Sequence, residues 1–522
     1  MSNNRSVMKH QFSRVPKVSI PRSSFDRSHG LKTTFDSGLL VPIFWDEVLP
    51  GDTFNLKMSA FSRMTTPIFP IMDNLFMETF FFFVPNRLVF TQWVNLNGEQ
   101  ENPGDSINFL VPEQVSTAAN GEGSLADYFG IPLTAGVAYN QLPFRAYNLI
   151  WNEWFRDQNL QNSITVPKNP TPQTEIFQVQ RRGKRHDYFT SCLPWPQKGE
   201  SVPLPLGTRA AVGVDLTAGD GSEGNPVRIG NLEIAGQARG MNVTTNSVDW
   251  GSSTTASPTT DLYADLSNAT AATINQLRQA FQVQRLQERD ARGGTRYTEI
   301  IRSHFGVVSP DARLQRPEFL GGGSTRINVT PVAQTSETTQ SSQSPQGNLA
   351  AYATASINGH GFTKSFTEHG HIIGLINVRA DLTYQQGLER MWSRRARYDF
   401  YWPSLAHIGE QAVLNKEIYY SGDENDNNVF GYQERYAEYR YKPSRITGKF
   451  RSTVADTLDP WHLSQNFSQL PQLNASFIQD EPPVKRTLAV ANQPEFIMDA
   501  YFQLRCARPM PLYGVPGLID HF

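Results

Sequence analysis

Cysteine is almost absent from this chain, with only Cys192 and Cys506 among its 522 residues. Two cysteines cannot form the disulfide framework of a secreted scaffold, which favours assembly in a reducing cytosol. The most apolar run, residues 76–90 (FMETFFFFVPNRLVF), is too short and too interrupted to span a bilayer. The N-terminal residues are polar and show no secretory leader. We therefore expect neither export nor membrane insertion.

Motifs of catalysis and of cofactor binding are also missing. The glycines at 321–323 are not followed by a Gly-Lys-Ser/Thr signature, and no Gly-x-Ser-x-Gly nucleophile elbow occurs. His360, His369 and His371 are spaced around one expected strand and could bind zinc. No nearby cysteine and no HExxH helix supports a metal, so a surface or interface role is favoured. We expect no enzyme activity, no cofactor and no metal.

Net charge is small, because 47 Lys and Arg oppose 49 Asp and Glu. The distribution is uneven, however, since residues 1–34 carry seven cations and a single acid, Asp26. A basic segment rich in Ser and Pro suits phosphate contacts, although a solubilising tail is the alternative interpretation. We treat residues 1–36 as a basic N-terminal arm. Its candidate DNA contacts are Arg5, Lys9, Arg14, Lys17 and Arg22.

Apolar patterning predicts a mainly β fold. The 38 Gly and 34 Pro divide the chain into many short segments with long connections. Residues 50–64 alternate polar and apolar side chains, as a half-buried strand does. Residues 77–85 form a continuous aromatic run that predicts a strand buried on both faces. Residues 371–384 and 495–509 are expected to be central strands. Together these strands predict a β-sandwich over residues 37–522.

Several insertions interrupt that pattern. Aromatic residues at helical spacing predict a helix over 144–160, and a second helix is expected over 272–289. Residues 206–262 are small, polar and rich in glycine, and we interpret them as a surface protrusion. Residues 321–350 are low in complexity and predict a long loop.

Two segments interleave cations with aromatic residues, namely 389–403 and 431–450. Such a mixture suits single-stranded nucleic acid, because rings stack on bases while guanidinium groups bind phosphates. Arg and Tyr also anchor protein interfaces, so a subunit interface is the competing interpretation, and a solvated face a third. The candidate DNA contacts are Arg394, Arg395, Arg397, Arg440, Lys442 and Arg445; the candidate interface residues are Trp392, Tyr398, Trp402, Tyr436 and Tyr439.

Six long segments, in order along nearly the whole chain, are similar to the major capsid proteins of the Microviridae, in particular their gokushovirus-like branch. They are FDRSHGLKTTFDSGLLVPIFWDEVLPGDTF (25–54), FRAYNLIWNEWFRDQNL (144–160), SCLPWPQKG (191–199), LQERDARGGTRYTEIIRSHFGV (286–307), ERMWSRRARYDFYWPSLAHIGEQAV (389–413) and DPWHLSQNF (459–467).

The resemblance implies an eight-stranded antiparallel viral jelly roll with long helical and loop insertions. Sixty copies would form a small T=1 icosahedral shell around circular single-stranded DNA. The expected partners are copies of the same chain, a scaffolding protein, a small basic DNA-packaging protein, a pilot protein and a host receptor reached through 206–262. The protein would reside in the virion, after assembly in the host cytoplasm. A β-sandwich that binds or acts on carbohydrate is the alternative.

Overall fold

The computed structural model describes residues 21–117, 120–170, 177–199, 209–211, 241–244, 247–250, 263–265, 274–294, 296–306, 308, 310, 315–336 and 346–513. Two compact units partition the chain. One comprises residues Met1–Lys198 and Glu288–Phe522, and the other is Gly199–Gln287. The first unit contains the large β-sheet, which we call the sandwich.

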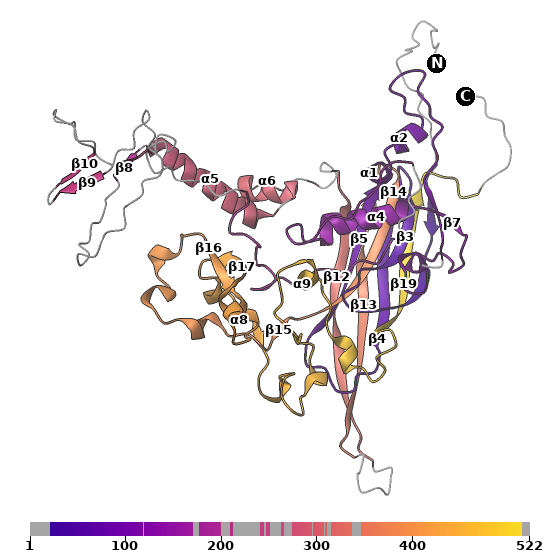
Figure 1. Cartoon of the computed structure of the whole chain (residues 1–522). Helices are drawn as coiled ribbons and strands as arrows, with labels where there is room; N and C mark the ends of the chain where they lie inside the picture. The colour runs from indigo at the N-terminus through magenta and orange to yellow at the C-terminus, as the bar shows by residue number, and fades with distance from the viewer. Residues whose placement is uncertain are drawn as a thin grey trace, which may run out of the picture. The chain divides into compact units, whose positions relative to one another are not determined.

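The sandwich is a single curled antiparallel sheet of nine strands (Figure 1). Its strand order is β1-β19-β4-β13-β12-β5-β14-β3, and β2 also pairs with β19. The predicted mainly antiparallel β-sandwich with helical and loop insertions is confirmed. The strand bounds are β1 Ser23–Asp26, β2 His29–Phe35, β3 Val41–Val48, β4 Thr53–Met64, β5 Leu75–Pro85, β12 Glu318–Ala333, β13 Leu349–Ser365, β14 Gly370–Ala380 and β19 Phe496–Arg508.

The sheet has one strand more than the predicted eight because the N-terminal segment contributes to it. Strands β1 and β2 pair in succession with β19, from Ser23 opposite Arg508 to Phe35 opposite Phe496. The prediction of an arm over 1–36 is therefore wrong for 23–35. Backbone pairing along β19, together with the buried ring of Phe35, holds these residues despite their basic composition. Residues 1–20 lie outside the described part of the chain.

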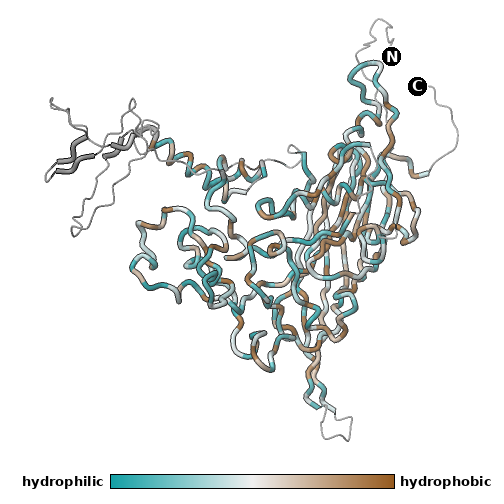
Figure 2. Tube along the Cα trace, in the orientation of Figure 1, coloured by the Kyte–Doolittle hydropathy of each residue, from teal (hydrophilic) through white to brown (hydrophobic). Residues whose placement is uncertain are grey.

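Strand β5 is buried on both faces, as its aromatic run predicts. Phe81 and Phe83 point into the core between the two halves of the sheet. Phe82 and Val84 lie on the opposite face, in a second cluster that includes helix α4 (Leu142–Ile150), and the Phe82 ring also contacts Trp154. Figure 2 shows hydrophobic residues concentrated along the strands of this sheet. The continuous apolar run is thus explained by two separate packing layers.

Strand β4 is buried on one face only. Phe54, Leu56 and Met58 enter the same core as Phe81, whereas Phe61 on the opposite face is 55% exposed. The period-two pattern of residues 50–64 therefore predicted the half-buried strand correctly.

The predicted loop over 321–350 is wrong for residues 321–333 and 349–350, which belong to β12 and β13. A Cβ atom at Gly322 would lie 2.1 Å from the carbonyl oxygen of Thr79, and one at Gly321 would lie 2.5 Å from that of Gly361. The glycines thus permit close strand approach where no side chain fits. Strand β12 also links the two halves of the sheet, since its first part pairs with β5 and its last part with β13.

Helix α4 (Leu142–Ile150) packs on the outer face of β5 and β14 (Figure 1). It continues as one π-helical turn, η2 (Trp151–Phe155), and the chain becomes extended at Arg156. The helix predicted over 144–160 is therefore confirmed to 155 and wrong beyond it. There the Asp157 carboxylate accepts hydrogen bonds from the backbone N–H groups of Asn159 and Leu160, which forms a turn instead.

The second predicted helix is confirmed as α5 (Ile274–Gly293), and α6 (Tyr297–Phe305) follows it. Further short elements of the first unit are α1 Asn86–Val89, α2 Trp93–Leu96, β6 Glu113–Val115, α3 Leu125–Tyr128, β7 Ala138–Asn140, η9 Asp459–Trp461, α9 Ala475–Ile478 and η10 Val484–Thr487.

The second unit contains two short antiparallel strand pairs. Strand β8 (Arg209–Ala211) pairs with β11 (Tyr263–Asp265), and β9 (Met241–Thr244) pairs with β10 (Ser247–Trp250). The other residues of the predicted protrusion at 206–262 lie outside the described part of the chain. Its protruding position stays a prediction.

Candidate interface and nucleic-acid surfaces

The two predicted segments of interleaved cations and aromatics come together in one region, residues 383–451, which we call the aromatic lobe. Short strands and 3-10 turns build it. They are β15 Thr383–Tyr384, η3 Arg390–Ser393, η4 Arg397–Asp399, η5 Pro403–Leu405, β16 Glu410–Leu414, α8 Asn415–Ile418, η6 Glu424–Asn427, β17 Val429–Glu434, η7 Ala437–Tyr439, β18 Ser444–Arg445 and η8 Gly448–Phe450.

Two carboxylates with little solvent exposure, Glu417 and Glu438, hold the lobe together. Glu417 accepts hydrogen bonds from Arg390 at 3.1 Å and from the Tyr188 hydroxyl at 2.9 Å. Burial raises the pKa of Glu417, and burial likewise raises the pKa of Tyr188. Glu438 binds Arg394 at 2.9 Å and Gln411 at 3.0 Å. The lobe is therefore a defined substructure with internal ion pairs, although it contains little regular secondary structure.

Three of the predicted DNA contacts in the lobe already have carboxylate partners within the chain. Arg394 pairs with Glu438 and lies 4.1 Å over the Tyr439 ring. Arg440 pairs with Glu434 at 2.6 Å, and Arg445 pairs with Glu389. Such pairing reduces the positive charge available for phosphate.

The remaining predicted DNA contacts differ in their placement. Arg395, Arg397 and Lys442 are exposed, and the Arg397 guanidinium lies 4.8 Å over Trp402. Arg22 donates to the Gly51 carbonyl at 2.7 Å and to Thr53 at 2.9 Å, so it fastens the chain to the sheet. Arg5, Lys9, Arg14 and Lys17 lie outside the described residues.

Most predicted interface residues are exposed on the lobe. Trp392 is 64% exposed and Tyr398 is 65% exposed, and Trp402 and Tyr439 are also exposed. The predicted interface role does not fit Tyr436, because its side chain is only 5% exposed and its hydroxyl donates to the Phe400 carbonyl. Other large apolar side chains exposed on the lobe are Met391, Phe400, Tyr401, Ile408, Tyr420, Val429 and Tyr441.

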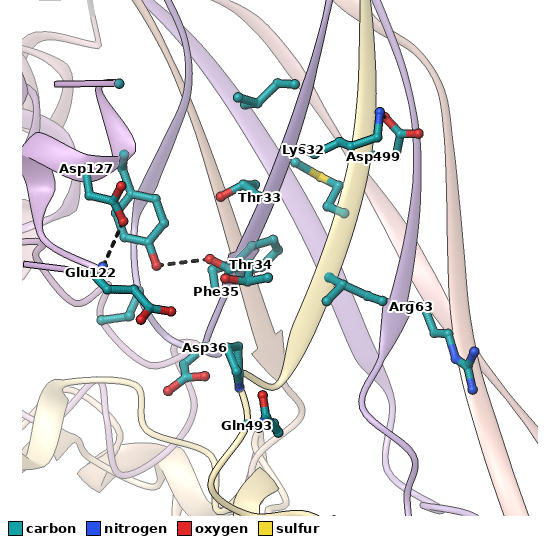
Figure 3. A pocket seen from close by; sticks show the side chains of 18 of the residues that line it. Lys32, Thr33, Thr34, Phe35, Asp36, Arg63, Glu122, Asp127, Gln493 and Asp499 are labelled. Carbon is teal, nitrogen blue, oxygen red and sulfur yellow. Dashed lines mark hydrogen bonds and ion pairs between the residues drawn. The ribbon is translucent and has the colours of Figure 1, made fainter. Parts of the chain in front are cut away.

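A groove of about 1200 Å³ lies beside the free edge of β2 (Figure 3). The Tyr128 hydroxyl donates to the Thr34 carbonyl, so this carbonyl points away from β19 and into the groove. In an antiparallel strand the backbone N–H and C=O groups of every second residue point to the same side. Those of Lys32 therefore also point into the groove. Sequence reasoning missed this edge, because it treated the segment as an arm.

The three histidines that could have bound zinc serve other contacts. His360 hydrogen-bonds Thr79 and Thr325, and His369 packs edge-on against Trp93. His371 is buried, and burial lowers its pKa to about 4. Within the described residues, no three His, Cys, Asp or Glu side chains gather as a metal site would require.

The described part of the chain combines an antiparallel sandwich, long insertions and a surface rich in aromatic residues and arginine. The capsid protein (F protein) family model matches residues 13–518, so the chain belongs to that family. It is 48% identical to the capsid protein VP1 of Bdellovibrio phage phiMH2K, 47% to that of Chlamydia phage 1 and 40% to that of Spiroplasma virus 4. These alignments cover 98% of this chain and 97–98% of each relative.

The resemblance to the Microviridae major capsid proteins is thereby confirmed, and it gives the chain a structural role in a capsid. No helix among the residues described has the length and apolarity needed to cross a membrane.

Proposed function

We propose that this chain is the subunit of a T=1 icosahedral shell of sixty copies that encloses circular single-stranded DNA. The shell would form in the host cytoplasm, together with a scaffolding protein, a small basic packaging protein and a pilot protein. Closure of many symmetric contacts would hold each subunit, so each single contact can be weak.

The aromatic lobe is the observation that carries this proposal. Exposed apolar patches of this kind are rare on monomers and mark interaction surfaces. Aromatic residues, Met and Arg are also the residues enriched at interface cores. Trp392, Tyr398, Trp402 and Tyr439 supply them on a substructure fixed by Glu417 and Glu438. The lobe is therefore our proposed contact with a second copy.

The interior would bind DNA without sequence preference. The arm residues Arg5, Lys9, Arg14 and Lys17 and the exposed lobe cations Arg395, Arg397 and Lys442 are our proposed phosphate contacts. Deletion of residues 1–20, which leaves β1 and β2 intact, should lower the DNA content of particles more than it lowers subunit stability. Unchanged DNA content would remove the arm from this role.

Host attachment is proposed for residues 206–262. This proposal is supported by the separation of Gly199–Gln287 into a compact unit of its own. Particles with a shortened 206–262 segment should assemble normally and adsorb poorly to host cells. Normal adsorption would contradict the assignment.

The shell itself is tested by producing the full chain with the other proteins of its virus and imaging the product by negative stain. Hollow spheres of uniform size are expected. Subunits that remain single under all these conditions would refute the proposed function.

A further inference from the structure

A second groove, of about 940 Å³, lies on the outer face of β5 and β14, and we call it the basic groove. The turn after η2, the segment 182–186, residues from 292 to 299 and the start of β12 contribute the other walls. Seven Arg and Lys side chains line the basic groove, against three carboxylates. An excess of cations in a partly enclosed space focuses a positive potential that attracts anions.

One side of the basic groove has three guanidinium groups around a single carboxylate. Glu78 pairs with Arg182 and, at 2.9 Å, with Arg379, and Arg185 lies 3.9 Å away. Arg185 also pairs with Asp381. Arg182 and Arg379 must still share one negative charge, so positive charge remains after the internal pairs form.

Little further negative charge is available to offset these cations on this side of the basic groove. Burial raises the pKa of the neighbouring Asp480 to about 7, so its carboxyl is only partly ionised at neutral pH. Burial, followed by the charge of Arg379, lowers the pKa of Arg182 to about 10. Both shifts arise mainly from burial, and the partly neutral Asp480 leaves Glu78 as the main negative charge beside Arg182 and Arg379.

The opposite side of the basic groove brings two more guanidinium groups together. Arg296 donates to the backbone carbonyls of Arg156 and Asn152 and pairs with Glu299 at 3.0 Å. Arg156 donates to the Gln161 carbonyl and has no ion-pair partner among the described residues. Burial and the nearby Arg296 charge lower the pKa of Arg156. A bound phosphate would relieve this repulsion.

Aromatic rings form the wall between the two sides. Phe80, Phe82 and Trp154 pack with Phe319 at centroid distances of 5.5–6.5 Å. Phe319 is 42% exposed, which leaves part of its ring open to a ligand. The Arg182 guanidinium lies 4.6 Å over the Phe80 ring. Flat apolar faces beside several cations match a polymer that alternates bases with phosphates.

We propose that the basic groove binds a short stretch of single-stranded DNA, with phosphates on Arg156, Arg182 and Arg296 and a base against Phe319. The proposal rests on the proposed function and adds a principal site to it. In the aromatic lobe, three cations are paired with Glu389, Glu434 and Glu438, which leaves Arg395, Arg397 and Lys442 as its proposed phosphate contacts.

The test is the affinity of the full-length subunit for a fluorescent oligo-dT of about 10 nucleotides, within the usual site size of such grooves, over a range of salt. Arg156→Gln removes a cation without leaving a carboxylate unpaired. It should weaken binding about fivefold and reduce the salt slope by about 0.7, the value of one phosphate contact on a single strand. Phe319→Ala should weaken binding about tenfold at every salt concentration, through lost stacking.

The matched control is Lys57→Gln, which removes one exposed cation from the open face of β4. It should bind as the unmodified chain does. Thermal unfolding of each variant shows that the fold is retained, and Arg156→Lys should recover most of the lost salt slope.

Two outcomes would overturn the basic groove as a DNA site. One is unchanged binding by Arg156→Gln and Phe319→Ala while Lys442→Gln in the lobe loses affinity. The other is competition by a poly-glutamate peptide as strong as that by oligo-dT, with no effect of Phe319→Ala, which would identify a site for acidic peptides. Shells that form and contain DNA despite either outcome would leave the proposed function standing, whereas absence of shells would refute the function itself.

Discussion

The sandwich and the aromatic lobe use aromatic residues in opposite ways. In β5 of the sandwich, Phe81 and Phe82 point to opposite faces and both are buried. In the lobe, Trp392 and Tyr398 are exposed, although the backbone around them is held by the ion pairs of Glu417 and Glu438. The difference indicates that the sandwich aromatics stabilise the subunit, whereas the lobe aromatics stay exposed in the single subunit, as the proposed contact with a second copy requires.

The largest effect should follow from opening the sandwich core. Phe81→Ala should lower the free energy of unfolding by about 3–5 kcal/mol, because it removes a fully buried ring and leaves a cavity. Denaturant unfolding measures this change. Phe61→Ala, on the open face of β4, is the control and should stay within about 0.5 kcal/mol. Equal losses for the two variants would contradict the two-layer description of the sheet.

The second-largest effect should come from acid, which should lower the free energy of unfolding of the sandwich. His371 has a pKa of about 4 in the fold, against 6.5 for an ordinary histidine, so between these values only the unfolded chain binds the proton. Stability should therefore fall by about 3 kcal/mol as pH drops from 6.5 to 4. His371→Leu should remove that loss, measured by unfolding at each pH, and the partly exposed His369→Gln should retain it. An unaltered pH profile in His371→Leu would disprove the assignment.

In the aromatic lobe, loss of an exposed ring should weaken assembly much more than it lowers the stability of the subunit. Trp392→Ala should change subunit stability by less than about 0.5 kcal/mol and still weaken assembly by about 2 kcal/mol per contact, the size of an interface hot spot. Light scattering during assembly measures the second effect. Tyr352→Ala, an exposed ring on β13 of the sandwich, serves as the control. Assembly by the Trp392 variant at the normal rate and concentration would remove the lobe from the interface.

The smallest change in the free energy of unfolding is expected from a substitution at the edge of the sandwich. Lys32 and Asp499 form an exposed ion pair at 3.4 Å between β2 and β19. Because water and salt screen such a pair, Lys32→Ala should cost less than about 0.5 kcal/mol in unfolding experiments. A loss above 1 kcal/mol would mean that the pair fastens β2 to the sheet.

The same contrast explains what could be predicted from the sequence. Strands β4 and β5 were predictable, because polar–apolar alternation and a continuous aromatic run directly report one or two buried faces. Strand β12 was missed, because Gly321–Gly323 resembles a loop until the carbonyls of Thr79 and Gly361 are seen to occupy the space of a side chain.

The candidate sites depended more on tertiary contacts. The exposure of Trp392 and Tyr398 followed from composition, but Tyr436 is buried beneath Phe400, which no local pattern reveals. The basic groove combines residues from Glu78 to Ile478, and no spacing along the chain brings these positions together. Charge pairing, such as that of Arg394 with Glu438, likewise becomes visible only in the fold.

Amide hydrogen exchange, compared between free subunits and assembled particles, tests the central claim most directly. The account predicts that residues 391–441 exchange much more slowly in particles than in free subunits, while β5 exchanges slowly in both. Identical exchange of residues 391–441 in the two states would show that the aromatic lobe stays uncovered in the shell and would contradict the account.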